Sequence, residues 1–180
     1  LKRLGVVFLL AALVASFGWI MVASGLIERP WVDAYKLTMH LSLAFILYSY
    51  LLWTTFRVLQ PAPPVIHKPV LKKWIVAITA VLAVQIVLGG TMSGMKAALF
   101  YPTWPDMNGV AVPAVLFQAG QWTVENFVDY DRSPFMPALV QALHRAVAYL
   151  LTIMILWFFF QVLKKSKNRQ VRTASYLLIS

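Results

Sequence analysis

The chain has 180 residues, of which 61% are hydrophobic and only 12% are charged. A water-soluble domain of this size would have too little polar surface to cover itself, so composition indicates an integral membrane protein. The net charge of +10 fits the topology of a membrane protein and does not require nucleic-acid binding. The absence of cysteine excludes disulfides, thiolate ligands and iron–sulfur clusters from this portion.

Four apolar intervals between charged residues predict four transmembrane helices, at residues 4–27, 37–56, 74–95 and 146–163. Each interval is close to the roughly 20 apolar residues that a helix needs to cross about 30 Å of hydrocarbon. The expected fold class is therefore an all-α integral membrane protein whose four helices form a bundle portion. The final residues, TASYLLIS, begin another apolar run, so we expect the chain to be part of a longer polytopic protein.

The charges divide unequally between the two sides of a four-span model. The basic residues on one side are Lys2, Arg3, Arg57, Lys68, Lys72, Lys73, Lys164, Lys165, Lys167, Arg169 and Arg172. The other side holds all the acidic residues, in outside loops 28–34 and 96–135. By the positive-inside rule the N-terminus is expected to be cytoplasmic. The first apolar run is too long for a secretory signal peptide and has no small-residue cleavage site.

A proline-rich inside loop at 60–73 is expected to link two helix pairs, at residues 1–59 and 74–180. Each pair ends its outward helix in a small-residue motif and carries one histidine on the returning helix. This pattern fits either a diverged internal duplication or ordinary helix capping. The outside loop 96–135 is rich in Trp, Tyr and Pro, which favours a lid with a short interfacial helix, although an interfacial aromatic belt is the alternative.

The three histidines differ in their expected surroundings. His67 lies in the proline-rich loop and is expected to be solvated. With Asp33 as the predicted N-cap of the second helix, His40 lies at about the same depth as His144, roughly 10–15 Å inside the outer helix ends. Either histidine could simply hydrogen-bond a neighbouring helix. Ionisable residues at membrane depth more often mark functional sites, which makes both candidate metal ligands.

Haem is the metal cofactor that this ligand set suits best. The spans contain no cysteine and no acidic residue, so a tetrahedral zinc site or a carboxylate-bridged metal pair would lack ligands. A haem needs only one or two axial imidazoles. Its propionates need cationic partners, and Arg145 is the best candidate, with Lys36 and Lys96 as further ones. Snorkelling of these cations to lipid head groups is the alternative.

Two other features accompany the histidines. Gln141 precedes His144 by three residues and could orient the imidazole, line the pocket or bond between helices. The glycines near the outer end of the third helix allow close approach of another helix or of a flat ring. They are Gly89, Gly90 and Gly94.

Four segments together resemble the haem A synthase family: GWIMVASGL (18–26), LTMHLSLAFILY (37–48), LGGTMSGMKAALFYPTWPDMNG (88–109) and VQALHRAVAY (140–149). The resemblance extends from about residue 18 to residue 163. It departs from the family pattern at Ala23, where Lys is frequent, and at Pro102, where Asn is frequent. Full-length members resemble two fused four-helix bundles, and this chain would correspond to helices three to six of eight.

The resemblance implies an enzyme of the bacterial inner membrane that oxidises a methyl group of haem O to the formyl group of haem A for terminal oxidases. His40 would then belong to the substrate haem and His144 to a haem b, each paired with a histidine that this chain lacks. Trp104, in the TWP motif, would lie near the cofactor. The acidic residue implicated in catalysis in the family would precede Leu1, so no general acid or base is assigned in this chain. Expected partners are haem O, lipid, haem O synthase, terminal oxidase subunits and a second copy of the chain.

Two other classes of function use the same residues. A membrane cytochrome b that carries electrons, for example from quinol, would also need the histidines and Arg145. A scaffold or assembly subunit without haem would need the histidines only as hydrogen-bonding groups. If the chain were complete as it stands, its two histidines would serve either one haem or two haems shared in a dimer.

Overall fold

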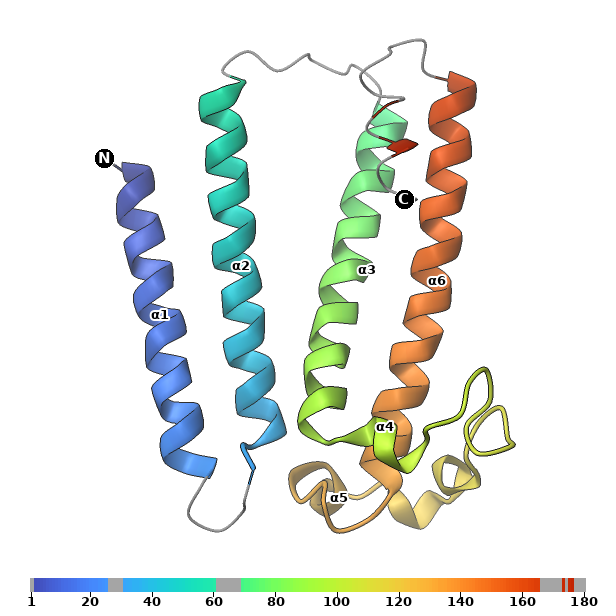
Figure 1. Cartoon of the computed structure of the whole chain (residues 1–180). Helices are drawn as coiled ribbons and strands as arrows, with labels where there is room; N and C mark the ends of the chain where they lie inside the picture. The colour runs from blue at the N-terminus through green and yellow to red at the C-terminus, as the bar shows by residue number, and fades with distance from the viewer. Residues whose placement is uncertain (1, 26–30, 61–68, 166–172, 174, 177–180) are drawn as a thin grey trace. The chain divides into compact units, whose positions relative to one another are not determined.

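The computed structural model describes residues 2–25, 31–60, 69–165, 173 and 175–176, and these residues are mostly helical (Figure 1). The long helices are α1 (Lys2–Gly25), α2 (Ala34–Leu59), α3 (Pro69–Gly94) and α6 (Phe135–Lys165). The elements between α3 and α6 are α4 (Ala97–Phe100), the 3-10 turns η1 (Ala114–Phe117) and η2 (Ala119–Gln121), and α5 (Val124–Val128). The part of the chain described contains no β-strand, only an isolated bridge between Met107 and Val110.

The four long helices are long and apolar enough to cross a membrane, which confirms the predicted fold class of an all-α membrane protein. Helices suit that environment because each backbone N–H and C=O is satisfied within its own segment. The last helix begins at Phe135, well before residue 146, because His144 and Arg145 are themselves helical. Short helices also form in the outside loop, as expected from its sequence.

Asp33 is the N-cap of α2, as the sequence predicts. Its carboxylate accepts hydrogen bonds from the backbone N–H groups of Tyr35 and Lys36, both at 3.0 Å. Helix α3 begins with Pro69, which is tolerated there because the first helical N–H has no partner within the helix. The rest of the expected linker, residues 61–68, lies outside the described residues, and the division into two helix pairs stays a prediction.

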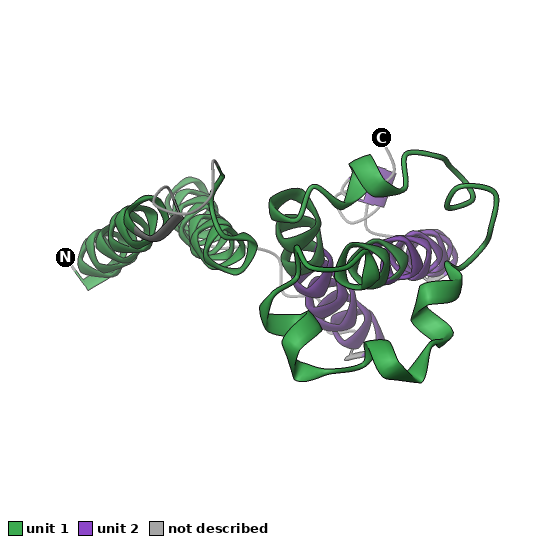
Figure 2. Ribbon diagram, turned by 90° about the horizontal axis from the view of Figure 1, so that it is seen from below, with its two compact units in different colours: residues 1–64, 86–142 green, residues 65–85, 143–180 purple. Residues whose placement is uncertain are grey.

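The chain forms two compact units (Figure 2). The first comprises residues 1–64 and 86–142. In this unit α1 packs along α2 (Figure 1). Its buried core joins the start of α2, the region around α4 and the start of α6. The core residues are Ala34, Met95, Ala97, Tyr130, Phe135, Met136 and Val140.

Small residues bring α2 against the end of α3 in the first unit. A Cβ atom added to Gly94 would lie 2.5 Å from the Cα of Ala34, so no side chain fits there. One turn earlier, a Cβ on Gly90 would lie 3.3 Å from Thr38. The buried hydroxyls of Thr38 and Thr91 are hydrogen-bonded at 3.1 Å. Of the two roles expected for these glycines, the structure shows helix packing at Gly90 and Gly94.

The second unit comprises residues 65–85 and 143–180. Its core contains Leu71 from α3 with Phe158 and Val162 from α6, and Trp74 and Ile78 pack against it.

Many large apolar side chains of the long helices are exposed, such as Phe8 (82%) and Trp19 (74%) on α1. Such surfaces are costly in water and suit contact with lipid or with further helices.

Tyr130 connects the outside loop to the first turn of α2. Its hydroxyl accepts a hydrogen bond from the backbone N–H of Ala34 (2.9 Å) and donates to Asp33 (3.3 Å). Tyr130 and Ala34 are 1% and 0% exposed. The outside loop therefore anchors the N-terminal end of α2, the helix that carries His40.

Replacing Tyr130 with phenylalanine is expected to lower the free energy of unfolding by about 1–3 kcal/mol, because the buried Ala34 N–H loses its acceptor. Chemical denaturation in detergent would measure the change. Tyr149→Phe is the matched control, since Tyr149 is 47% exposed on α6. A similar loss in both variants would contradict the role of the Tyr130 hydroxyl.

Candidate functional site

His40 lies on α2 with its imidazole against α1. Its Nδ1 is 3.0 Å from the carbonyl oxygen of Val14. A carbonyl can only accept a hydrogen bond, so in the neutral imidazole Nδ1 carries the proton and Nε2 carries the lone pair. The ring also lies against Gly18, where an added Cβ would be 3.0 Å from Cε1. Among the described residues His40 makes no other hydrogen bond, and Nε2 has the chemical form of a metal ligand.

His144 lies on α6 in the second unit and is bonded to a residue that the sequence did not single out. The side-chain nitrogen of Gln85, on α3, lies 3.1 Å from its Nε2. The amide nitrogen donates, so Nε2 accepts and Nδ1 carries the proton. Nδ1 of His144 and Oε1 of Gln85 are buried and have no hydrogen-bond partner in the part of the chain described. Buried polar atoms without partners are costly, and such atoms are characteristic of a site that a bound group completes.

Gln141 is buried near the start of α6. Its amide nitrogen donates to the carbonyl oxygen of Tyr101 at 2.7 Å, which ties α6 to the residue after α4. Its Oε1 is buried without a partner among the described residues. This bond from α6 to the outside loop is not among the roles expected from sequence, which stay predictions.

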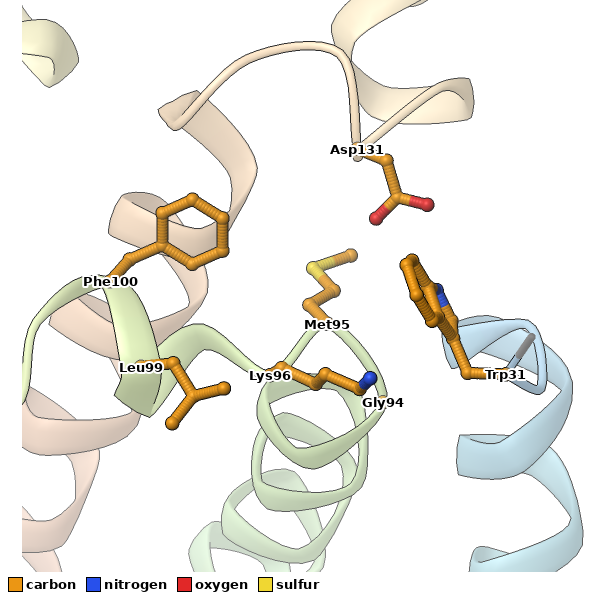
Figure 3. Close-up of a pocket in the computed structure, with 7 residues that line it drawn as sticks. All are labelled: Trp31, Gly94, Met95, Lys96, Leu99, Phe100 and Asp131. Carbon is orange, nitrogen blue, oxygen red and sulfur yellow. The ribbon is translucent and has the colours of Figure 1, made fainter. Parts of the chain in front are cut away.

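Lys96 takes part in an open pocket of about 350 Å³ in the first unit (Figure 3). Its Nζ lies 4.0 Å from the centre of the Trp31 ring, a cation–π contact. Figure 3 shows the side chains of Lys96 and Asp131 directed toward Trp31. The pocket is lined by Trp31, Gly94, Met95, Lys96, Leu99, Phe100 and Asp131. An apolar lining with one cation and one carboxylate suits an amphipathic ligand.

The other predicted site residues occupy separate positions. Lys36 lies on the first turn of α2, one turn before His40, and is half-buried. Arg145 is half-buried on α6 beside His144. Trp104 is 73% exposed in the outside loop, where its peptide bond to Pro105 is cis. His67 lies outside the described residues.

The donor set fits haem better than a multi-ligand metal site. Among the residues described, no group of three or more His, Cys, Asp or Glu side chains could hold a metal ion. A haem requires only one or two axial imidazoles, and each unit holds one imidazole on a long apolar helix. The Nε2 lone pair of His40 and the partnerless buried atoms beside His144 are both compatible with a bound porphyrin.

Sequence reasoning missed two residues that contact the histidines. Gln85 carries the one amide side chain of α3, and a lone amide inside an apolar span is a recognisable signal of a polar contact between helices. Gly18 stands at the start of a segment used for the resemblance, but nothing local distinguishes it from Gly5 on the same helix. Only the packing of α1 on α2 reveals its contact with His40.

These features define a polytopic helical membrane protein with a candidate haem ligand on each of two spans. A model of the cytochrome oxidase assembly protein family matches residues 1–180, and the chain belongs to this family.

Curated relatives support the same assignment. The chain is 36% identical to a protein of Nitrosomonas eutropha over 185 residues, which cover 99% of this chain and 49% of the relative. It is 36% identical to one of a Bradyrhizobium species over 180 residues (98% and 48%). It is 43% identical to one of Methylorubrum extorquens over 153 residues (79% and 36%). Each of these relatives is named "Heme A synthase".

The chain spans about half the length of the first two of these relatives. No solved structure matches the chain.

Proposed function

We propose that this chain is part of a haem A synthase, which oxidises the methyl substituent of haem O to the formyl group of haem A. The observation that carries the proposal is the hydrogen bond that fixes the tautomer of His40. A backbone carbonyl holds its Nδ1 proton and leaves the Nε2 lone pair available for haem iron. The names of relatives that match nearly the whole chain support the reaction.

Each histidine has a distinct role in this proposal. His40 would hold the substrate haem, and His144 would hold a haem b, which would supply electron transfer. A second imidazole for either haem would come from the remaining length that the relatives have or from a second copy of the chain. His144 would exchange its bond with Gln85 for the iron, and the buried amide would then stay beside the ligand.

Cationic residues at the outer ends of the helices are proposed to bind the propionates. Arg145 follows His144 directly, and a guanidinium can pair with a carboxylate through two parallel hydrogen bonds. Lys36 and Lys96 are proposed for other propionates, and the cation–π contact with Trp31 would hold the Lys96 amine at the pocket. Trp104 is proposed to contact the porphyrin from the outside loop.

The proposed setting is the inner membrane of a bacterium, with the N-terminus in the cytoplasm. The distribution of basic residues supports this orientation. Haem O synthase is proposed to supply the substrate, because its product is haem O, and terminal oxidase subunits would receive haem A. The family's description as cytochrome oxidase assembly proteins supports that link.

Cells that make haem O but lack a haem A synthase provide the test of function. Expression of the intact gene is expected to convert haem O to haem A, which chromatography of extracted haems would separate. The double variant His40→Ala, His144→Ala is the control and should leave haem O unchanged. If the intact gene leaves haem O unchanged while the protein still binds haem, the function is that of an electron-carrying cytochrome b. A purified protein without a Soret band after haem supplementation would indicate a scaffold.

A further inference from the structure

We infer that the backbone of α1 positions His40: the Val14 carbonyl selects the tautomer of the imidazole, and the bare surface of Gly18 sets the place of the ring. Val14 and Gly18 are thus positioning residues for a ligand on another helix. The inference concerns the imidazole itself. Its consequence for iron binding rests on the proposed function.

The tautomer follows from the contact with Val14. The Nδ1 atom of His40 lies 3.0 Å from the carbonyl oxygen, which can serve only as an acceptor. The other ring nitrogen of a neutral imidazole must then carry the lone pair. Metal-binding histidines commonly donate their second ring N–H to a carbonyl in this way, which fixes both the tautomer and the ring orientation.

The place of the ring follows from the absence of a side chain at residue 18. A Cβ atom there would lie 3.0 Å from Cε1, 3.3 Å from Nδ1 and 3.9 Å from Nε2 of His40. Val14 and Gly18 are four residues apart on α1, so they lie on the same face of the helix. The Val14 carbonyl that bonds the ring and the space left by the missing side chain of Gly18 therefore lie on the same face of α1.

Glycine needs such a reason inside a long helix, because it weakens the helix relative to alanine. The same helix contains an internal comparison. A Cβ on Gly5 would meet nothing within 4 Å, whereas the three heavy atoms nearest to a Cβ on Gly18 all belong to the His40 ring. Replacing either glycine with alanine changes the helix propensity of α1 in the same way. Only the replacement of Gly18 places a methyl group against the His40 imidazole.

The first experiment measures the tautomer without haem. Nitrogen NMR of the haem-free intact protein, labelled at histidine and held at a pH where the ring is neutral, should show His40 protonated at Nδ1. His40→Ala identifies its signals. In Gly18→Ala the ring should move from the carbonyl and lose this single tautomer, whereas Gly5→Ala should match the wild type. Protonation at Nε2 in the wild type would overturn the inference, even if Gly18→Ala failed to fold.

The second experiment measures haem binding by the intact protein. Gly18→Ala should weaken haem binding by about 10–100-fold and shift the low-spin spectrum, because the ligating imidazole would lose the hydrogen bond that orients it. Gly5→Ala should change neither property. If His40→Ala loses the haem but Gly18→Ala behaves like Gly5→Ala, the inference is wrong and the proposed ligand stands. If His40→Ala retains an unchanged spectrum, the proposed ligand is wrong, and the NMR result alone decides the inference.

Discussion

Replacing His144 with alanine in the intact protein is expected to abolish the low-spin spectrum of the haem proposed to bind at His144, or to convert it to a high-spin spectrum. The imidazole is the one histidine side chain of α6, and removing an axial ligand leaves the iron with an open coordination position. Absorption spectroscopy of the purified protein, in oxidised and reduced forms, measures the change. The effect should be close to complete, because neither Gln85 nor Arg145 is a suitable replacement ligand.

His67→Ala provides the matched control for this experiment. His67 lies in the proline-rich segment expected to be solvated, so its loss should leave the haem spectrum unchanged. Gln85→Leu adds a second comparison, since it removes the amide bonded to His144 but retains the imidazole. It should preserve bound haem and alter only the details of the spectrum. Equal spectral effects from His144→Ala and His67→Ala would contradict the assignment of His144 as a ligand.

Gly94→Val is expected to destabilise the protein by about 3 kcal/mol, near the upper end for overpacking of a tight interface. A Cβ at this position would lie 2.5 Å from the Cα and 2.7 Å from the Cβ of Ala34, both on the rigid start of α2. Neither atom can move without displacing the helix. The displacement would also separate the hydroxyls of Thr38 and Thr91 and disturb the helix that carries His40.

Denaturation in detergent, followed by helical circular dichroism, would measure the loss of stability. Gly5→Val is the control, because it places the same β-branched residue in a long helix where nothing lies within 4 Å. Subtracting its effect removes the change in helix propensity and leaves the cost of the clash. If both variants lost the same stability, the close approach of α2 to α3 would not be the structural constraint that we describe.

Local sequence was sufficient where one segment specifies its own structure. The four spans could be predicted because each long apolar run satisfies its backbone internally as a helix. The N-cap at Asp33 could be predicted because a short carboxylate before an apolar segment reaches the first free N–H groups. The charge-free interval 146–163 covers only part of α6, which begins at Phe135, because Arg145 lies within the helix and does not end it. The depth expected for His144 already placed that residue inside the helix.

The neighbours of the two histidines could not be predicted in the same way. That His40 contacts Val14 and Gly18, and His144 contacts Gln85, depends on how each helix is rotated and shifted against its partner. An apolar helix surrounded by lipid has no strong polar face to reveal that rotation. Gln141 illustrates the same limit: its spacing suggested a role beside His144, but its amide nitrogen donates to the Tyr101 carbonyl.

By itself the sequence determined that this is a helical membrane protein with four long apolar helices, and that His40 and His144 fall inside two of them. These properties depend on composition and on local hydrogen bonding. Only the tertiary structure decided which nitrogen of His40 carries the proton, which residue contacts His144, and why Gly18 and Gly94 have no side chain. Those properties depend on distances of a few ångströms between helices, which no single segment specifies.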